Sequence, residues 1–300
     1  MAMSNSDRFK ARMGTRLTRA PQQVSRACGL ALLAAWLAGC ASVPSQPQPF
    51  SFVQMCDPQI GLTDYAAELA RFRRAVEQIN QLRPDFVVIC GDLVEGASRE
   101  SFADFNAAKA GLRVPCYCAP GNRDLGEAPT LQSLRFYRES IGRDYYSFEH
   151  QGCVFIIVDT QLWKAYVGEE SEKQDAWLKQ TLAAAARKGR RIFVVGHIPL
   201  FARTAEEPNG HDNLPLEKRR ELLALFERHG VQVLLAGHTH RTLVRDFDGI
   251  QMVTAETTSL NLDFHPFGFR LWHIGAARPY RHEFIMLKLG SNSRSDTLKR

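Results

Sequence analysis

Five short apolar segments of this 300-residue sequence end in side chains that can bind a metal ion. The side chains are carboxylates, carboxamides and imidazoles, and the set contains no thiolate. Such a mixed nitrogen and oxygen donor set suits Fe, Mn, Zn or Mg and differs from the donor set of a structural thiolate zinc site. The residues are Asp57 and Gln59 in MCDPQIG, Asp92 in ICGDLVEG, Asn122 in APGNRD, His197 in VVGHIPL, and His238 and His240 in LAGHTHR.

The number of these side chains predicts two metal ions, because two carboxylates, three imidazoles and an amide exceed the ligands of one four-coordinate ion. Two ions roughly 3.5 to 4 Å apart activate a water molecule and clamp the attacking and leaving oxygens of a phosphoryl group. His238 and His240 are two residues apart, and on an extended segment this spacing points both imidazoles to one face. Each residue alone is more often a turn or loop residue than a ligand, so the hypothesis depends on their convergence.

The segments that carry these residues alternate with helical patterns, which favours an α/β fold. Ligands of an α/β sheet bind outside the carboxyl ends of its strands, so residues far apart in the sequence can converge there. The final quarter predicts closely spaced strands, two of them joined by an Asp248-Gly249 turn. The expected strands are residues 50–56, 85–90, 114–119, 191–196, 231–237, 240–247, 250–256, 269–274 and 281–289, and the expected helices are residues 66–82, 101–112, 171–188 and 216–229.

The order of the motifs resembles that of the calcineurin-like metallophosphoesterase superfamily, and the resemblance covers residues 50 to about 289. It implies a four-layer αββα sandwich of two mixed β-sheets flanked by helices. It also implies that a metal-bridged hydroxide hydrolyses a small phosphorylated substrate, either a phosphate monoester or a diester. By this resemblance Asp57, Asp92 and His240 hold the first of two divalent or trivalent ions, Asp92 bridges, and Asn122, His197 and His238 hold the second.

Two residues depart from the family pattern, in which histidine is usual at both positions. Gln59 is shared with a subgroup of calcineurin-like phosphoesterase domain-containing proteins, and its amide is a weaker ligand that favours a harder ion such as Mn or Mg. Arg123 stands where the family has a histidine that assists the leaving group. Arginine stays protonated but grips two phosphoryl oxygens, so it favours leaving groups that depart unprotonated. Asp124, which orients that histidine in the family, completes the predicted catalytic set of Asn122, Arg123 and Asp124.

Both departures also motivate an alternative, a catalytically weakened phosphate- or nucleotide-binding protein of the same fold. Trp163, Tyr166, His265 and Arg270 are weaker candidates for substrate contact. A nuclease is not favoured. Although the formal net charge is +6, six basic residues and one acidic residue precede Cys40, which leaves the rest of the chain nearly neutral. Nucleic-acid binding needs a clustered basic face, so no nucleic-acid partner is expected. The oligomeric state is left open.

The N-terminal segment predicts a lipid-anchored protein of the bacterial cell envelope. Basic residues precede an apolar run from Ala27 to Ala38, which is shorter than the roughly 20 residues of a membrane span. The sequence LAGC resembles the bacterial lipobox and implies a lipid on Cys40, with an uncleaved helix as the alternative. Ala41 then implies the outer membrane and a protein facing the periplasm. The predicted parts are a signal peptide at 1–39, a flexible tether at 40–49, the metallophosphoesterase domain at 50–290 and a polar tail at 291–300.

Overall fold

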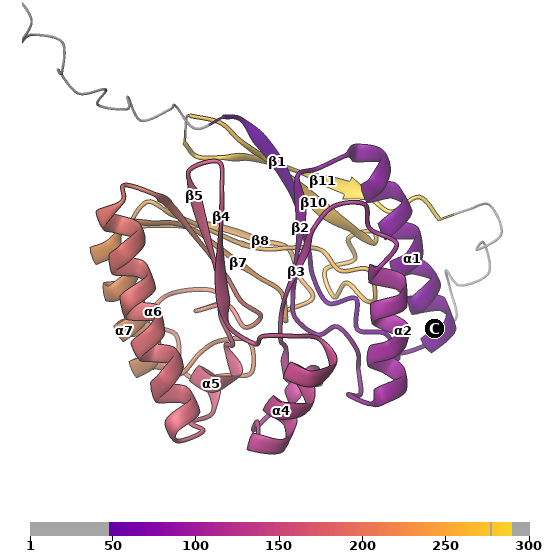
Figure 1. Cartoon of the computed structure of the whole chain (residues 1–300), viewed down its shortest axis with the longest axis horizontal. Helices are drawn as coiled ribbons and strands as arrows, with labels where there is room; N and C mark the ends of the chain where they lie inside the picture. The colour runs from indigo at the N-terminus through magenta and orange to yellow at the C-terminus, as the bar shows by residue number, and fades with distance from the viewer. Residues whose placement is uncertain (1–47, 277, 290–300) are drawn as a thin grey trace, which may run out of the picture. The chain divides into compact units, whose positions relative to one another are not determined.

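The computed structural model describes residues 48–276 and 278–289. Two mixed β-sheets pack face to face, and helices cover the outer face of each sheet (Figure 1). This confirms the predicted four-layer αββα sandwich. The predicted signal peptide, Cys40, most of the tether and the polar tail lie outside the described residues.

The first sheet has the strand order β11-β10-β1-β2-β3, and the second has the order β4-β5-β6-β7-β9-β8. In the first sheet β1, β2 and β3 are parallel, and β10 and β11 add antiparallel pairs. In the second sheet β5, β6, β7 and β9 are parallel, between antiparallel edge strands. The strands are β1 (Phe50–Met55), β2 (Phe86–Cys90), β3 (Cys116–Ala119), β4 (Tyr146–His150), β5 (Cys153–Ile157), β6 (Arg191–Val195), β7 (Val231–Ala236), β8 (Leu243–Phe247), β9 (Ile250–Thr254), β10 (Gly268–Ile274) and β11 (Arg281–Met286).

Helices α1 and α2 lie on the side of the first sheet, and α6 and α7 lie on the side of the second (Figure 1). Their apolar faces pack on the sheets, which leaves two apolar clusters beneath the helices and a third cluster between the sheets. The helices are α1 (Tyr65–Leu82), α2 (Arg99–Lys109), α3 (Asn122–Leu125), α4 (Leu131–Ser140), α5 (Gln161–Lys164), α6 (Glu169–Arg187) and α7 (Leu216–His229).

Aromatic rings fill the space between the two sheets. Phe52 of β1 stacks on Phe86 of β2 with ring centroids 5.1 Å apart and on Trp272 of β10 at 5.7 Å. Across the interface, the ring of Phe155 of β5 packs edge-to-face against Phe86 at 4.9 Å and against Phe52 at 5.3 Å. Such pairs contribute about 0.5–1.5 kcal/mol each beyond the burial of area. This packing fixes the two sheets, and therefore the loops at their ends, relative to each other.

The predicted helices agree with α1, α2, α6 and α7 to within three residues at each end. Helix α2 begins earlier than predicted because Ser98 forms a capping box ahead of the first apolar residue. The short helices α3 and α5, helix α4 and strand β4 were not predicted. Leu134 and Tyr137 of α4 are buried three residues apart, and the residues of β4 alternate between half-buried and exposed, so both elements have a periodic pattern from which they could have been predicted.

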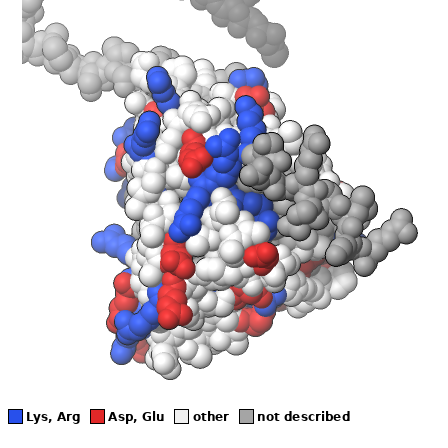
Figure 2. Space-filling model, turned by 90° about the vertical axis from the view of Figure 1, so that its right-hand side faces the viewer, with Lys and Arg blue, Asp and Glu red and all other residues white. Residues whose placement is uncertain are grey.

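No helix within the described residues is long and apolar enough to cross a bilayer. On the face shown in Figure 2, a short run of Lys and Arg side chains is flanked by Asp and Glu. The five cysteines of the described residues are free thiols, and four of them are buried. The sheets are therefore held by packing and hydrogen bonds in the part of the chain that the structure describes.

Candidate metal centre

Loops that follow β1, β2, β3, β6 and β7 bring the predicted ligands together. The most compact part of the cluster surrounds Asn122. Its Oδ1 lies 2.9 Å from Nε2 of His197 and 3.1 Å from Nδ1 of His238, and these two nitrogens are 3.2 Å apart. Nε2 of His197 is also 3.3 Å from Oδ1 of Asp92. Four atoms that can bind a metal therefore converge on one point.

Asp57, Gln59 and His240 lie beside this group. Oδ1 of Asp57 is 3.7 Å from Nε2 of His240 and 3.8 Å from Nδ1 of His197. The backbone N–H of His238 donates to both carboxylate oxygens of Asp57, at 3.0 and 3.1 Å. Oε1 of Gln59 is buried and has no hydrogen-bond partner among the described residues. A buried acceptor without a partner is costly, and a cation would satisfy it.

Each imidazole of the cluster is anchored through its outer nitrogen by a backbone carbonyl. A carbonyl only accepts hydrogen bonds, so the anchored nitrogen carries the proton and the opposite nitrogen faces the cluster. Histidines that bind metals are oriented in this way. The anchoring pairs are Nδ1 of His197 with the carbonyl of Cys90 at 2.8 Å, Nε2 of His238 with that of His211 at 3.0 Å, and Nδ1 of His240 with that of Leu260 at 2.6 Å.

The buried carboxylates and imidazoles of the cluster have shifted pKa values, because burial disfavours their charged forms and neighbouring charges oppose or favour them. Burial raises the pKa of Asp57 to about 6. Burial, followed by the positive charge of His197, lowers the pKa of His238 to about 3. Burial also opposes a charge on His197, but the carboxylates of Asp92 and Asp57 outweigh it and raise the pKa of His197 to about 10. The carboxylates thus require a positive charge at this point, which metal ions would provide while the imidazoles stay neutral. The residues present fit a metal centre.

The backbone of the cluster is unusual. Residues other than glycine rarely adopt a positive φ, and those that do cluster at functional sites, where the surroundings hold the strain. Among the described residues nine such non-glycine positions occur, and five of them are predicted ligands. Their φ angles are 45° at Asp57, 40° at Gln59, 49° at Asp92, 68° at His238 and 51° at His240.

Glycines provide the room for the two central carboxylates. A Cβ atom on Gly121 would lie 2.1 Å from Oδ1 of Asp92, and a Cβ atom on Gly237 would lie 2.4 Å from Oδ2 of Asp57. Neither distance is possible for a real side chain. The glycines of the GN and GH motifs are therefore required by the close approach of the carboxylates.

Arg123 and Asp124 occupy different environments. The backbone N–H of Arg123 donates to Oδ1 of Asp92 at 2.8 Å, while its guanidinium borders the hollow and is 40% exposed. Asp124 is buried and accepts from the backbone N–H groups of Leu93 at 3.0 Å and Gly121 at 2.9 Å. Asp124 thus ties the loop after β2 to the loop after β3 and does not line the hollow.

The cluster opens into a hollow of about 200 Å³. The ring of His211 stacks on that of His238 with centroids 4.5 Å apart, at the border of this hollow. Five predicted ligands line the hollow, namely Gln59, Asp92, Asn122, His238 and His240, whereas Asp57 and His197 lie behind them. The remaining lining residues are polar Arg123, His211, Asp212 and Thr239 and apolar Leu62, Leu260 and Leu262.

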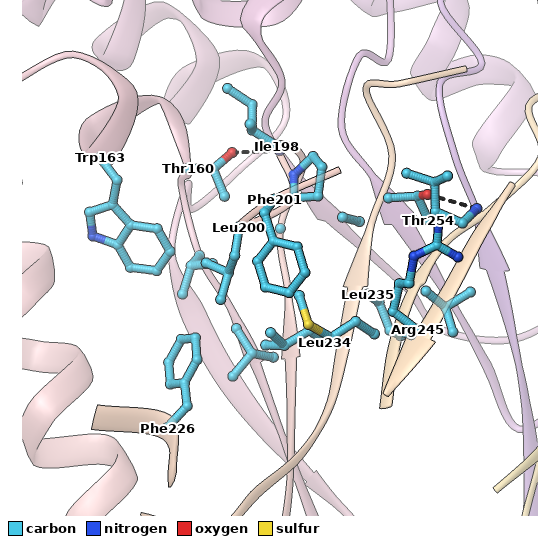
Figure 3. Close-up of a pocket in the computed structure, with 18 residues that line it drawn as sticks. Thr160, Trp163, Ile198, Leu200, Phe201, Phe226, Leu234, Leu235, Arg245 and Thr254 are labelled. Atoms are coloured by element: carbon cyan, nitrogen blue, oxygen red, sulfur yellow. Dashed lines mark hydrogen bonds between the residues drawn. The ribbon is translucent and has the colours of Figure 1, made fainter. Parts of the chain in front are cut away.

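A second cavity, of about 40 Å³, is apolar and lies against the second sheet (Figure 3). Leu200 and Phe201 point into it from the segment after β6, and the backbone N–H of Ile198 donates to Oγ1 of Thr160 at 3.0 Å. It offers no set of metal-binding side chains. This cavity is therefore a gap in the apolar packing next to His197 and is not the candidate active site.

The weaker candidates lie away from the hollow. Trp163 lines the apolar cavity and donates to Asp175 at 2.8 Å. Arg270 is buried and donates to Glu256 at 2.6 Å. Tyr166 and His265 do not line the hollow either.

Three residues near the cluster were not predicted, namely His211, Glu95 and Glu127. Glu95 lies three residues after Asp92 and Glu127 five residues after Asn122, so their position in the same loops was a usable signal. His211 lies in the loop between β6 and α7, away from any strand end, and had no such signal.

The fold and the cluster together define a phosphoesterase that depends on metal ions. Residues 52–242 match the model of the calcineurin-like phosphoesterase family, and the chain belongs to that family. It is therefore a phosphoric ester hydrolase of a family that uses two metals. The motif-based prediction is confirmed at the level of the family.

Known proteins agree with this assignment. The chain is 32% identical over 248 residues to the serine/threonine-protein phosphatase CPPED1 of Danio rerio, covering 74% of this chain and 80% of that protein. It is 29% identical over 190 residues to the 3',5'-cyclic adenosine monophosphate phosphodiesterase CpdA of Escherichia coli, covering 62% and 66%. A crystal structure of a dimetal phosphatase from Danio rerio has the same fold, with a TM-score of 0.59, 18% identity, and 80% and 99% of the two chains covered.

Proposed function

We propose that the protein hydrolyses phosphate monoesters whose leaving groups depart without a proton, such as aryl phosphates. The observation that carries this proposal is the position of Arg123, which lines the hollow beside the predicted metal ligands where the family has histidine. The proposed ligands of one ion are Asp57, Gln59, Asp92 and His240, and those of the other are Asp92, Asn122, His197 and His238.

When bound, the two ions supply an activated water and neutralise charge on the phosphoryl oxygens. Oδ1 of Asp92, the proposed bridging ligand, accepts a hydrogen bond from the backbone N–H of Arg123 and lies 3.3 Å from Nε2 of His197. The nearest carboxylate to the guanidinium is that of Glu95, at 3.6 Å, which leaves the fork of donors able to bind two phosphoryl oxygens. The guanidinium does not release a proton at neutral pH, so it stabilises charge without assisting the leaving group.

The lining of the hollow supports an aryl monoester. A monoester brings a dianion, which two cations and a guanidinium suit better than the single charge of a diester. Leu62, Leu260 and Leu262 offer apolar contact to an aromatic leaving group. One relative is named a protein phosphatase, which acts on monoesters, and another is named a cyclic-nucleotide phosphodiesterase, which acts on a diester. The similarity to the phosphatase covers more of this chain and so favours a monoester.

The test compares the wild type with Arg123→Ala and Arg123→His after removal of metal and addition of Mn²⁺. The substrates are p-nitrophenyl phosphate, bis-p-nitrophenyl phosphate and glycerol 2-phosphate. We expect the wild type to prefer the aryl monoester. We expect Arg123→Ala to lower kcat/KM on it by about 10- to 100-fold, the size of a lost charge-assisted hydrogen bond. Arg123→His should narrow the gap between aryl and alkyl phosphates, because imidazole can donate a proton.

An unchanged leaving-group dependence in all three proteins would contradict the role of Arg123. Metal ions that bind without turnover of any substrate would instead favour the alternative of a phosphate- or nucleotide-binding protein. In that case Gln59 and Arg123, the two departures from the family pattern, would mark a site that binds metal and phosphate without catalysis.

We also propose that a lipid on Cys40 anchors the protein to the outer membrane, facing the periplasm. Only the sequence supports this, through the LAGC motif and the apolar run before it. Mass spectrometry of the protein from a bacterial membrane fraction should find Cys40 as a diacylglyceryl-modified N-terminus. Cys40→Ala should abolish the modification. An unmodified mature protein, or one that begins elsewhere, would refute the anchor.

A further inference from the structure

Two of the proposed metal ligands are carboxamides, and a carboxamide binds a metal ion through its oxygen and not through its NH₂ group. The two ends of an amide are nearly equal in size, so packing alone does not decide which end faces the metal. In both cases a glutamate lies beside the amide nitrogen. Nε2 of Gln59 donates to Oε2 of Glu95 at 2.5 Å, and Nδ2 of Asn122 donates to Oε1 of Glu127 at 2.7 Å.

An ionised carboxylate only accepts hydrogen bonds, so each glutamate holds the NH₂ end of its amide and turns the oxygen away. Oδ1 of Asn122 then faces His197 and His238. Oε1 of Gln59 is left buried and without a hydrogen-bond partner among the described residues. A flipped amide would lose a charge-assisted hydrogen bond and would turn N–H groups toward the cluster.

The backbone holds Glu95 and Gln59 in register. The N–H of Gln59 donates to the carbonyl of Asp92 at 2.8 Å, and the N–H of Glu95 donates to the carbonyl of Ile60 at 3.1 Å. Neither Glu95 nor Glu127 lines the hollow. Glu127 therefore reaches the cluster through the amide of Asn122. Glu95 reaches it through the amide of Gln59 and also lies 3.6 Å from the guanidinium of Arg123, so metal affinity without substrate is the measurement that isolates its effect on Gln59.

We propose that Glu95 and Glu127 are positioning residues that fix the amides of Gln59 and Asn122 so that both present oxygen to the metal ions. Glu95 thereby adapts the site to glutamine at a position where the family has histidine. The inference rests on the ligand assignment of the proposed function, and the test measures metal affinity without substrate.

The experiment titrates Mn²⁺ into the metal-free full chain by isothermal calorimetry. Glu95→Ala and Glu127→Ala should each weaken one of the two binding events by about 10- to 100-fold, the usual effect of removing a group that orients a ligand. Glu95→Gln and Glu127→Gln should recover most of the affinity, because a glutamine Oε1 still accepts from the neighbouring amide. Thermal melts of each variant confirm that the protein is folded.

Double variants separate positioning from a general effect of charge. In a Gln59→Ala background, Glu95→Ala should cause no further loss of affinity, and Glu127→Ala should cause none in an Asn122→Ala background. Additive losses, or glutamine variants as weak as the alanine variants, would overturn the inference. If the wild type binds Mn²⁺ and shows these effects but hydrolyses no phosphoester, the proposed function fails while the positioning role is upheld.

Discussion

Asp92→Asn lowers kcat/KM on p-nitrophenyl phosphate by at least about 10³-fold, because it removes a charge that the cations require and that is worth several kcal/mol. Oδ1 of Asp92 is 3.3 Å from Nε2 of His197 and accepts the backbone N–H of Arg123. Asparagine keeps the shape and the acceptor oxygen and tolerates the positive φ of 49° at this position. The variant should therefore fold and lose only the negative charge. Steady-state kinetics with added Mn²⁺ measures the loss.

Asp248→Asn is the matched control. Asp248 also has a φ of 49°, but it is an exposed residue of the turn between β8 and β9. The same change of charge at the same backbone conformation should leave kcat/KM within about twofold, since surface substitutions of this kind are usually nearly neutral. Comparable activity of Asp92→Asn and the wild type would remove Asp92 from the metal-binding set and, with it, the proposed bridge between two ions.

The sequence was informative about this site because its ligands follow buried strands. Asp57, Asp92 and His197 come directly after apolar segments that became β1, β2 and β6, and parallel strands bring their carboxyl ends together. The hydrophobic period therefore predicted both the α/β fold and the convergence of these side chains. It did not lead to α4, although the buried Leu134 and Tyr137 of that helix have the three-residue spacing of a helical face.

Loop residues that orient the ligands of the cluster could not be predicted from hydrophobic periodicity. The carbonyl of His211 anchors the ring of His238, yet it comes from a loop whose course depends on tertiary packing. The direction of the Asp124 side chain could not be predicted from the sequence either. By the family resemblance, Asp124 would orient the histidine that Arg123 replaces, whereas here it accepts backbone N–H groups and joins two loops. Side-chain direction and hydrogen-bond partners depend on distances that a linear pattern does not contain.

Gly121→Ala is expected to displace the loop that Asp124 holds through its hydrogen bond to the backbone N–H of Gly121. The added Cβ would lie 2.1 Å from Oδ1 and 2.3 Å from the backbone nitrogen of Asp92, so the loops after β2 and β3 must move apart. Overpacking of this kind costs about 1–3 kcal/mol in the free energy of unfolding. The larger effect is expected on catalysis, because a displacement of about 1 Å of a reacting group can cost about 100-fold in rate. Thermal melts and kcat on p-nitrophenyl phosphate measure the two effects.

Gly96→Ala adds the same methyl group a few residues beyond Asp92, where no atom lies within 4 Å of the new Cβ. It should leave both stability and kcat close to the wild type, so the comparison isolates the contact with Asp92 from any general effect of replacing a glycine in the loops after β2 and β3. Because φ at Gly121 is −118°, alanine can adopt its backbone conformation, and strain in φ cannot account for a loss. Equal activity of Gly121→Ala and Gly96→Ala would mean that the loops can separate without cost. The close approach of the loops after β2 and β3 would then not determine the position of the Asp92 carboxylate.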